Sequence, residues 1–98
     1  MSAEESGPIL AAADDRRRDY FEKMLASYAR SRGFSDQQEK ILRHHLAGTK
    51  NKEIASLCGC SEGTVHEHWR RMAKKIGGRY QDEVIGDFHR YLGAQGVS

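Results

Sequence analysis

Apolar residues recur three or four positions apart along most of this chain, and polar residues fill the positions between them. This spacing puts the apolar side chains on one side of a helix, and nothing in the pattern requires a β-sheet. Glycines separate the periodic segments. We therefore predict an all-α fold with helices at about residues 12–32, 36–47, 50–58, 62–76 and 81–92.

Residues that start and stop helices lie at the ends of these segments. Gly59 can adopt the left-handed conformation that ends a helix, and Ser61 follows it as an N-cap for the next one. Ser35 and Gln38 have the capping-box spacing, and Thr49 is a candidate cap for the helix that ends near residue 58. Two short helices joined by a glycine turn are typical of a helix-turn-helix unit, which inserts its second helix into DNA.

The predicted helix at residues 62–76 has two unlike sides. Its apolar stripe comprises Val65, Trp69 or Met72, and Ile76. The polar and basic side chains lie largely outside that stripe: His66, Glu67, Arg70, Arg71, Lys74 and Lys75. A basic outward side of this kind suits contacts to phosphates and base edges.

Composition and charge narrow the function. A chain of 98 residues suits one small domain, and it shows no convincing catalytic set, so we expect no enzyme. The net charge of +2 hides an asymmetry. Residues 43–79 carry eight Lys and Arg against three Glu, a net charge of +5, whereas residues 80–98 carry one Arg against three acids. The basic segment would attract phosphates, although a solvated charged surface is the alternative.

The central segment resembles the DNA-binding domain of the LuxR/FixJ/GerE family of bacterial transcription regulators. The match covers residues 34–92 and rests on these residues in order: Ile41-Leu42, Gly48, Asn51-Lys52-Glu53-Ile54-Ala55, Gly59, Ser61-Glu62, Thr64-Val65, His68 and Lys75-Ile76-Gly77. It implies a four-helix helix-turn-helix domain, here preceded by one extra N-terminal helix. It also implies a sequence-specific transcription regulator that binds double-stranded DNA as a homodimer, with helix 62–76 in the major groove.

The resemblance also assigns roles to residues by position. It implies base contacts from His66, Glu67 and Arg70. The candidates for phosphate contact are Lys52, Thr64, Arg71 and Lys74. The candidates for dimerisation lie on the last helix and on the N-terminal helix: Val84, Ile85, Phe88, Tyr20 and Met24. The family usually has arginine and then glutamate where this chain has Gln37 and Gln38, so an ion pair that could anchor that helix is missing.

In this interpretation the chain has four parts. They are a flexible tail at 1–11, the N-terminal helix at 12–32, the helix-turn-helix domain at 33–92 and a frayed end at 93–98. Members of the family commonly carry a receiver or sensor domain before this one. Only about thirty residues precede it here, so we expect a stand-alone regulator. The aromatic stripe of helix 12–32 could pack on the domain, pair with a second copy or bind RNA polymerase or another regulator, and we favour an interaction role.

Two other functions fit parts of the pattern. A sigma region-4-like module would bind RNA polymerase and promoter DNA through a similar basic helix. A protein-interaction adaptor would hold a partner with the N-terminal helix and would have lost its affinity for DNA. The positive charge of residues 43–79 argues against complete loss.

A zinc site is suggested by four residues, Cys58, Cys60, His66 and His68. Their spacing does not support it. The two histidines point about 200° apart on a helix, and the cysteines stand where the family has leucine and isoleucine. We expect small, buried, apolar cysteines, no metal and no cofactor. The sequence has neither a signal peptide nor a run of ~20 apolar residues, so we expect a cytoplasmic protein at the bacterial nucleoid, without a membrane partner.

Overall fold

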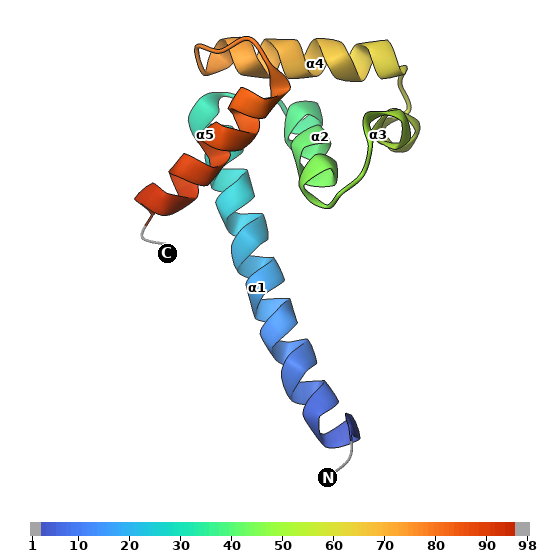
Figure 1. The fold of residues 1–98 in the computed structure, drawn as a ribbon, viewed down its shortest axis with the longest axis vertical. Helices are drawn as coiled ribbons and strands as arrows, with labels where there is room; N and C mark the ends of the chain where they lie inside the picture. Colours follow the sequence, from blue (N-terminus) through green and yellow to red (C-terminus); the bar gives the residue numbers. More distant parts are fainter. Residues whose placement is uncertain (1–2, 96–98) are drawn as a thin grey trace.

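The computed structural model describes the backbone of residues 3–95 and the side chains of residues 16–95. Over that part the chain forms five helices and no strand, which confirms the all-α fold. The helices are α1 (Ala3–Arg32), α2 (Asp36–Leu46), α3 (Asn51–Cys58), α4 (Glu62–Lys75) and α5 (Gln81–Ala94). In Figure 1, α2 to α5 lie close together and the long helix α1 extends away from them.

The predicted signals at two helix starts are confirmed. Ser35 Oγ accepts a hydrogen bond from the Gln38 backbone at 3.1 Å, and Gln38 Oε1 accepts from the Ser35 backbone at 3.0 Å, which completes the capping box of α2. Gly59 ends α3 with a left-handed φ of 68°. Ser61 Oγ then accepts from the Thr64 backbone at 3.1 Å and opens α4.

The predicted cap of α3 is wrong. Lys50, not Thr49, is the residue before the helix, and its side chain makes no cap hydrogen bond. Thr49 instead belongs to the end of α2, because its backbone N–H donates to the carbonyl of His44 at 3.0 Å. A lysine has no acceptor to offer, so Lys50 leaves the first backbone N–H groups of α3 without a side-chain cap.

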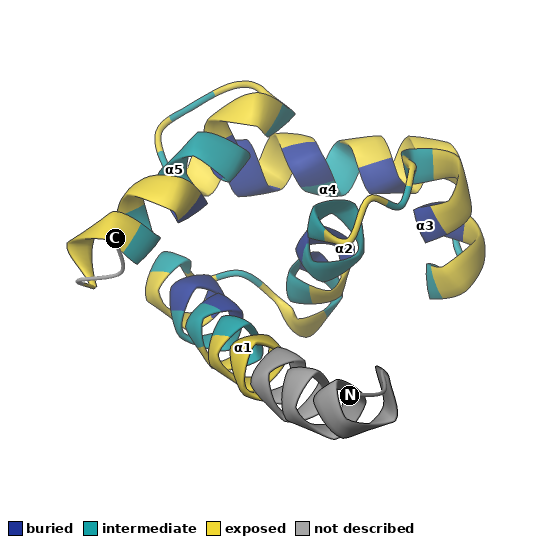
Figure 2. Cartoon of the chain, turned by 60° about the horizontal axis from the view of Figure 1, so that its bottom comes forward, coloured by how far each residue is buried: buried dark blue, intermediate teal, exposed yellow. Residues whose placement is uncertain are grey.

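Each of the five helices contributes to one hydrophobic core. The buried apolar residues are Leu25, Tyr28 and Ala29 from α1, Ile41 and Leu42 from α2, Ile54 and Ala55 from α3, Val65, Trp69, Met72 and Ala73 from α4, and Val84 and Phe88 from α5. Figure 2 shows the buried stretches of α4 on the side that faces α2. The core therefore fixes which side of α4 remains exposed.

The C-terminal part of α1 belongs to this core. Leu25 and Tyr28 have no exposed surface, and the Tyr28 ring meets Phe34, Phe88 and Tyr91 edge-on at centroid distances of 5.6, 5.2 and 5.4 Å. Of the three possibilities for this helix, packing on the domain is what its C-terminal part does. A domain boundary at residue 33 would cut through the core, because aromatic residues of α1 complete it.

The N-terminal part of α1 begins earlier than expected. The helix starts at Ala3, so most of the segment predicted as a flexible tail is helical. The helix runs through Gly7 and Pro8, which disfavour a helix interior, and the apolar periodicity that predicted a start near residue 12 does not extend to them. Residues 1–2, and residues 96–98 of the predicted frayed end, lie outside the described residues. Helix α5 extends to Ala94, two residues past the end expected at 92.

The projection of α1 dominates the shape of the molecule. The principal extents of the molecule are 52 × 32 × 19 Å, and its radius of gyration is 15.9 Å. A compact domain of this length has a radius of gyration of about 13 Å. Within the described residues, no helix is both long and apolar enough to cross a bilayer.

Candidate nucleic-acid interface

The inward side of α4 is fixed by apolar packing and by one hydrogen bond. Val65, Trp69 and Met72 are buried, as the apolar stripe predicted, and Ile76 packs against the core from its edge. The Trp69 indole N–H donates to Asn51 Oδ1 at 3.1 Å, and its ring meets the His45 ring edge-on at 5.3 Å. Trp69 therefore joins α4 to α2 and to the start of α3, and it cannot stack on a base.

The opposite side of α4 carries the residues expected to contact DNA. Thr64, His66, Arg70, Arg71 and Lys74 are exposed, and Glu67 is half-buried among them. The side chains of Arg70 and Arg71 are 71% and 63% exposed. The structure thus brings the predicted base-facing residues and three of the four predicted phosphate-contacting residues together on one surface.

The fourth predicted phosphate-contacting residue, Lys52, lies exposed in the first turn of α3. Thr64 lies in the first turn of α4, next to the Ser61 cap. Helix N-termini carry a partial positive charge and free N–H groups, which attract phosphates. Lys52 and Thr64 therefore lie where a helix N-terminus would add to the attraction between the basic side chains and a DNA backbone.

Glu67 is already paired within α4. Its two carboxylate oxygens accept from Arg70 Nη2 and from Arg71 Nε, the latter at 3.2 Å. The hydrogen bond from Arg70, aided by the positive charges of both arginines, lowers the pKa of Glu67 below its usual range. The carboxylate therefore stays ionised at neutral pH and has donors without any contact to DNA.

Lys75 turns away from this surface. Its ammonium group donates to the Gly33 carbonyl and to Gln38 Oε1, both at 2.8 Å, and it lies 5.9 Å from the centre of the Phe34 ring. Gln38 is 4% exposed. An anchor between α2 and α4 thus exists although the ion pair expected in the family is missing. Local spacing does not predict this anchor, because Lys75 is far from Gly33 and Gln38 along the chain.

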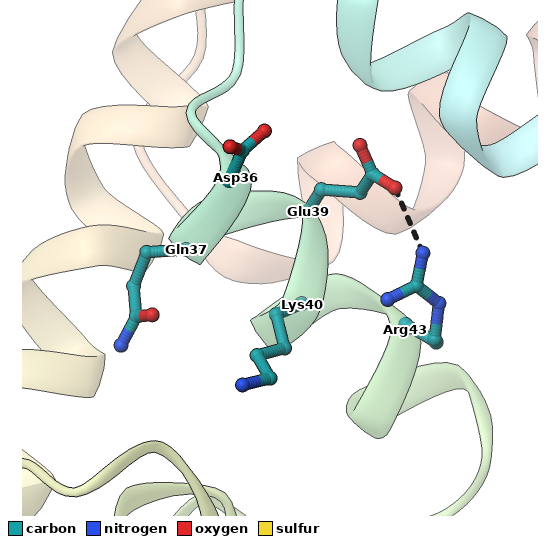
Figure 3. Close-up of a pocket in the computed structure, with 5 residues that line it drawn as sticks. All are labelled: Asp36, Gln37, Glu39, Lys40 and Arg43. Carbon is teal, nitrogen blue, oxygen red and sulfur yellow. Dashed lines mark hydrogen bonds and ion pairs between the residues drawn. The ribbon is translucent and has the colours of Figure 1, made fainter.

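Arg43 also contributes less to the basic surface than the charge count suggests. It donates to Glu22 of α1 and to Glu39 of α2, both at 2.8 Å. Figure 3 shows the contact to Glu39. It lies beside a surface hollow of about 330 Å³ along α2, which is lined by Asp36, Gln37, Glu39, Lys40 and Arg43. The hollow mixes charges of both signs, so it is a poor phosphate site.

The candidates for dimerisation separate into buried and accessible residues. Val84 and Phe88 have no exposed surface, and Phe88 packs against Phe21 and Tyr28 of α1. Both side chains belong to the core, and α1 covers Phe88, so neither is accessible in this structure. Tyr20 is 45% exposed, and Met24 and Ile85 are partly exposed. These three residues are the candidates that a second copy could reach.

Cys58 is the last residue of α3, and Cys60 lies in the turn between α3 and α4. Cys58 and Cys60 are free thiols, each partly buried against the core, which agrees with a role as small apolar residues. Across the described side chains there is no group of three or more His, Cys, Asp and Glu residues that could hold a metal ion.

Helices α3 and α4, the left-handed Gly59 between them and the outward basic side of α4 define a helix-turn-helix DNA-binding domain. Consistent with this class, the family profile GerE, described as bacterial regulatory proteins of the luxR family, matches residues 32–85. The chain belongs to this family of DNA-binding regulators. No match was found among curated proteins or among solved structures.

Proposed function

We propose that the chain is a sequence-specific regulator of bacterial transcription that inserts α4 into the major groove of its operator. The observation that carries this proposal is the exposed basic side of α4, directly opposite the side that the core buries. In this proposal His66, Glu67 and Arg70 face the base edges. Arg70 has the fork of N–H donors that suits guanine O6 and N7.

Phosphate contacts would hold α4 in register with the groove. Lys52, Thr64, Arg71 and Lys74 are all exposed and come from the two helices of the helix-turn-helix unit. Contacts of this kind supply affinity on any sequence and carry no base preference. Membership of the luxR family supports DNA binding by this unit.

We further propose that two copies bind a two-fold related site. Their α4 helices would lie about one DNA turn apart, roughly 34–36 Å. Ile85 on α5, or Tyr20 and Met24 on α1, would make the contact between copies, since these side chains keep exposed surface. Sedimentation of the intact chain, compared with Tyr20→Ala and Ile85→Ala, would tell the two interfaces apart.

The function is tested by selecting bound sequences from a random duplex library. The affinity for the winning duplex is then compared with that for a scrambled duplex over a series of salt concentrations. A palindromic winner with a large ratio of affinities is expected. Uniform and steeply salt-dependent binding would contradict sequence specificity. Absence of any binding would contradict the proposal and favour an adaptor that acts through the projecting part of α1.

A further inference from the structure

Glu67 lies between two arginines that have different proposed tasks. Arg70 follows it by three residues and Arg71 by four, and on a helix both positions are neighbours of Glu67. One carboxylate oxygen accepts from Arg70 Nη2 and the other from Arg71 Nε. A single carboxylate therefore joins the arginine proposed to read a base to the arginine proposed to bind a phosphate.

Pairing with Glu67 leaves Arg70 able to read guanine. A guanidinium group has five N–H donors in one plane, and the contact to Glu67 uses the Nη2 atom. Nη2 carries two N–H donors, so the second one remains and can form, together with Nη1 or Nε, the parallel pair of hydrogen bonds that guanine accepts. The Arg70 side chain is 71% exposed, so these donors can be reached. Glu67 thus restricts the orientation of Arg70 without consuming its binding capacity.

The same pairing works against contacts to phosphates. A phosphate oxygen competes with the carboxylate for the same N–H groups, since both are anionic acceptors. The carboxylate also repels a phosphate that approaches it. A phosphate bound by Arg70 or Arg71 must therefore displace Glu67 or overcome its charge, whereas a guanine edge, which is neutral, meets neither obstacle.

We propose that Glu67 is a specificity-determining residue that positions Arg70 and Arg71 and restrains both from the phosphates of random DNA. A glutamate can also read DNA directly, by accepting a hydrogen bond from the amino group of cytosine. In this proposal Glu67 makes no such contact and acts through the two arginines. The inference rests on the proposed function of α4, and it assigns a role to the carboxylate that faces the groove.

The test compares Glu67→Gln with the intact protein on the selected duplex and on a scrambled duplex, over a series of salt concentrations. The variant should bind the scrambled duplex several-fold more tightly, and the slope of log affinity against log salt should steepen by about one. Affinity for the selected duplex should change less, so the specificity ratio falls. Glu53→Gln is the matched control, because it removes the same charge from the exposed side of α3.

Two outcomes on DNA would overturn the inference. If Glu53→Gln lowers the ratio as much as Glu67→Gln, the effect is one of overall charge. If Glu67→Gln weakens binding to the selected duplex alone and relaxes a preference for cytosine at one base pair, Glu67 reads that base directly. Selection from the random library with the variant would reveal the relaxed position.

A measurement without DNA separates this inference from the proposed function. Titration of the Glu67 carboxyl carbon by NMR should give a pKa below the usual range, which rises when Arg70 and Arg71 are both replaced by alanine. An ordinary pKa in the intact protein would overturn the inference. If the pairing is present but the protein binds no duplex, the proposed function of α4 falls, and the role of Glu67 on DNA falls with it.

Discussion

Asp87 and Glu67 are both paired with two arginines, but they lie in different settings. The Asp87 side chain is 15% exposed, and it accepts from Tyr28 Oη at 2.8 Å and from Arg32 Nε at 2.7 Å, with Arg90 3.8 Å away. The Glu67 side chain is 38% exposed, and both its arginines come from its own helix. Asp87 thus joins α5 to α1, whereas Glu67 joins no two helices.

This difference determines what each carboxylate can do. The donors to Asp87, Tyr28 and Arg32, lie on another helix, so these contacts form only in the folded protein and stabilise it. The Glu67 contacts are local and solvated, so they add little to stability. The same chemical group therefore stabilises the protein at the α1–α5 junction and adjusts binding on the outer side of α4.

The largest change is expected at the junction itself. Tyr28→Ala removes a ring with no exposed surface that packs on Phe34, Phe88 and Tyr91. The free energy of unfolding should fall by about 3–5 kcal/mol, as for other large aromatic truncations. Urea denaturation followed by circular dichroism measures this loss. A loss below about 1 kcal/mol would show that α1 is not part of the folded core in solution.

Asp87→Ala should come next, because it leaves Arg32 and the Tyr28 hydroxyl without their acceptor. We expect the free energy of unfolding to fall by about 1–3 kcal/mol. Equilibrium unfolding in urea at neutral pH provides the measurement, with Glu67→Ala as the control in which stability barely changes. Equal losses in the two variants would remove the distinction between the two regions.

The stabilisation from Asp87 should also depend on pH. Burial alone would raise the pKa of Asp87, but the hydrogen bonds from Arg32 and Tyr28 outweigh it and hold the pKa below the usual range. The contribution is therefore complete above the ordinary aspartate pKa of about 4 and is lost as the pH falls through the lower value of the folded protein. Unfolding curves at several acidic pH values should converge for the intact protein and Asp87→Ala.

On the outer side of α4 the readout is binding instead of stability. Arg70→Ala should weaken binding to the selected duplex by about 1–3 kcal/mol. It should weaken binding to the scrambled duplex much less. Lys74→Ala should weaken both duplexes by similar amounts. Fluorescence anisotropy with the two duplexes separates these patterns. Similar patterns for both variants would remove Arg70 from the base-facing set.

The smallest change in stability is expected for an ion pair that joins two helices, as Asp87 does, but is exposed to solvent, as Glu67 is. Glu22 of α1 pairs with Arg43 of α2 across helices, as Asp87 does, but the two side chains are 42% and 37% exposed, like those on α4. Glu22→Gln should cost about 0.2–1 kcal/mol of unfolding free energy, because solvent screens the pair. Thermal unfolding at low and high salt tests this, since the difference should shrink as salt is added. A loss as large as that of Asp87→Ala would show that crossing between helices matters more than burial.

The sequence predicted what depends on neighbours along the chain. The capping box at Ser35, the left-handed turn at Gly59 and the buried side of α4 follow from local spacing, and the structure confirms each of them. Contacts between distant residues have no local signal. Nothing in the spacing of Tyr28 and Asp87 shows that they meet, and nothing in the spacing of Val84 and Phe88 shows that the core buries both of them.

The bridge from Lys75 to Gly33 has a mechanical consequence. Gly33 directly follows the last residue of α1, and Lys75 is the last residue of α4, so one side chain joins the end of the long helix to the end of the DNA-facing helix. A helix of 30 residues is about 45 Å long. The outer part of α1 therefore projects from the core as a long arm, and Lys75 ties the base of this arm to the end of the helix that carries the basic surface.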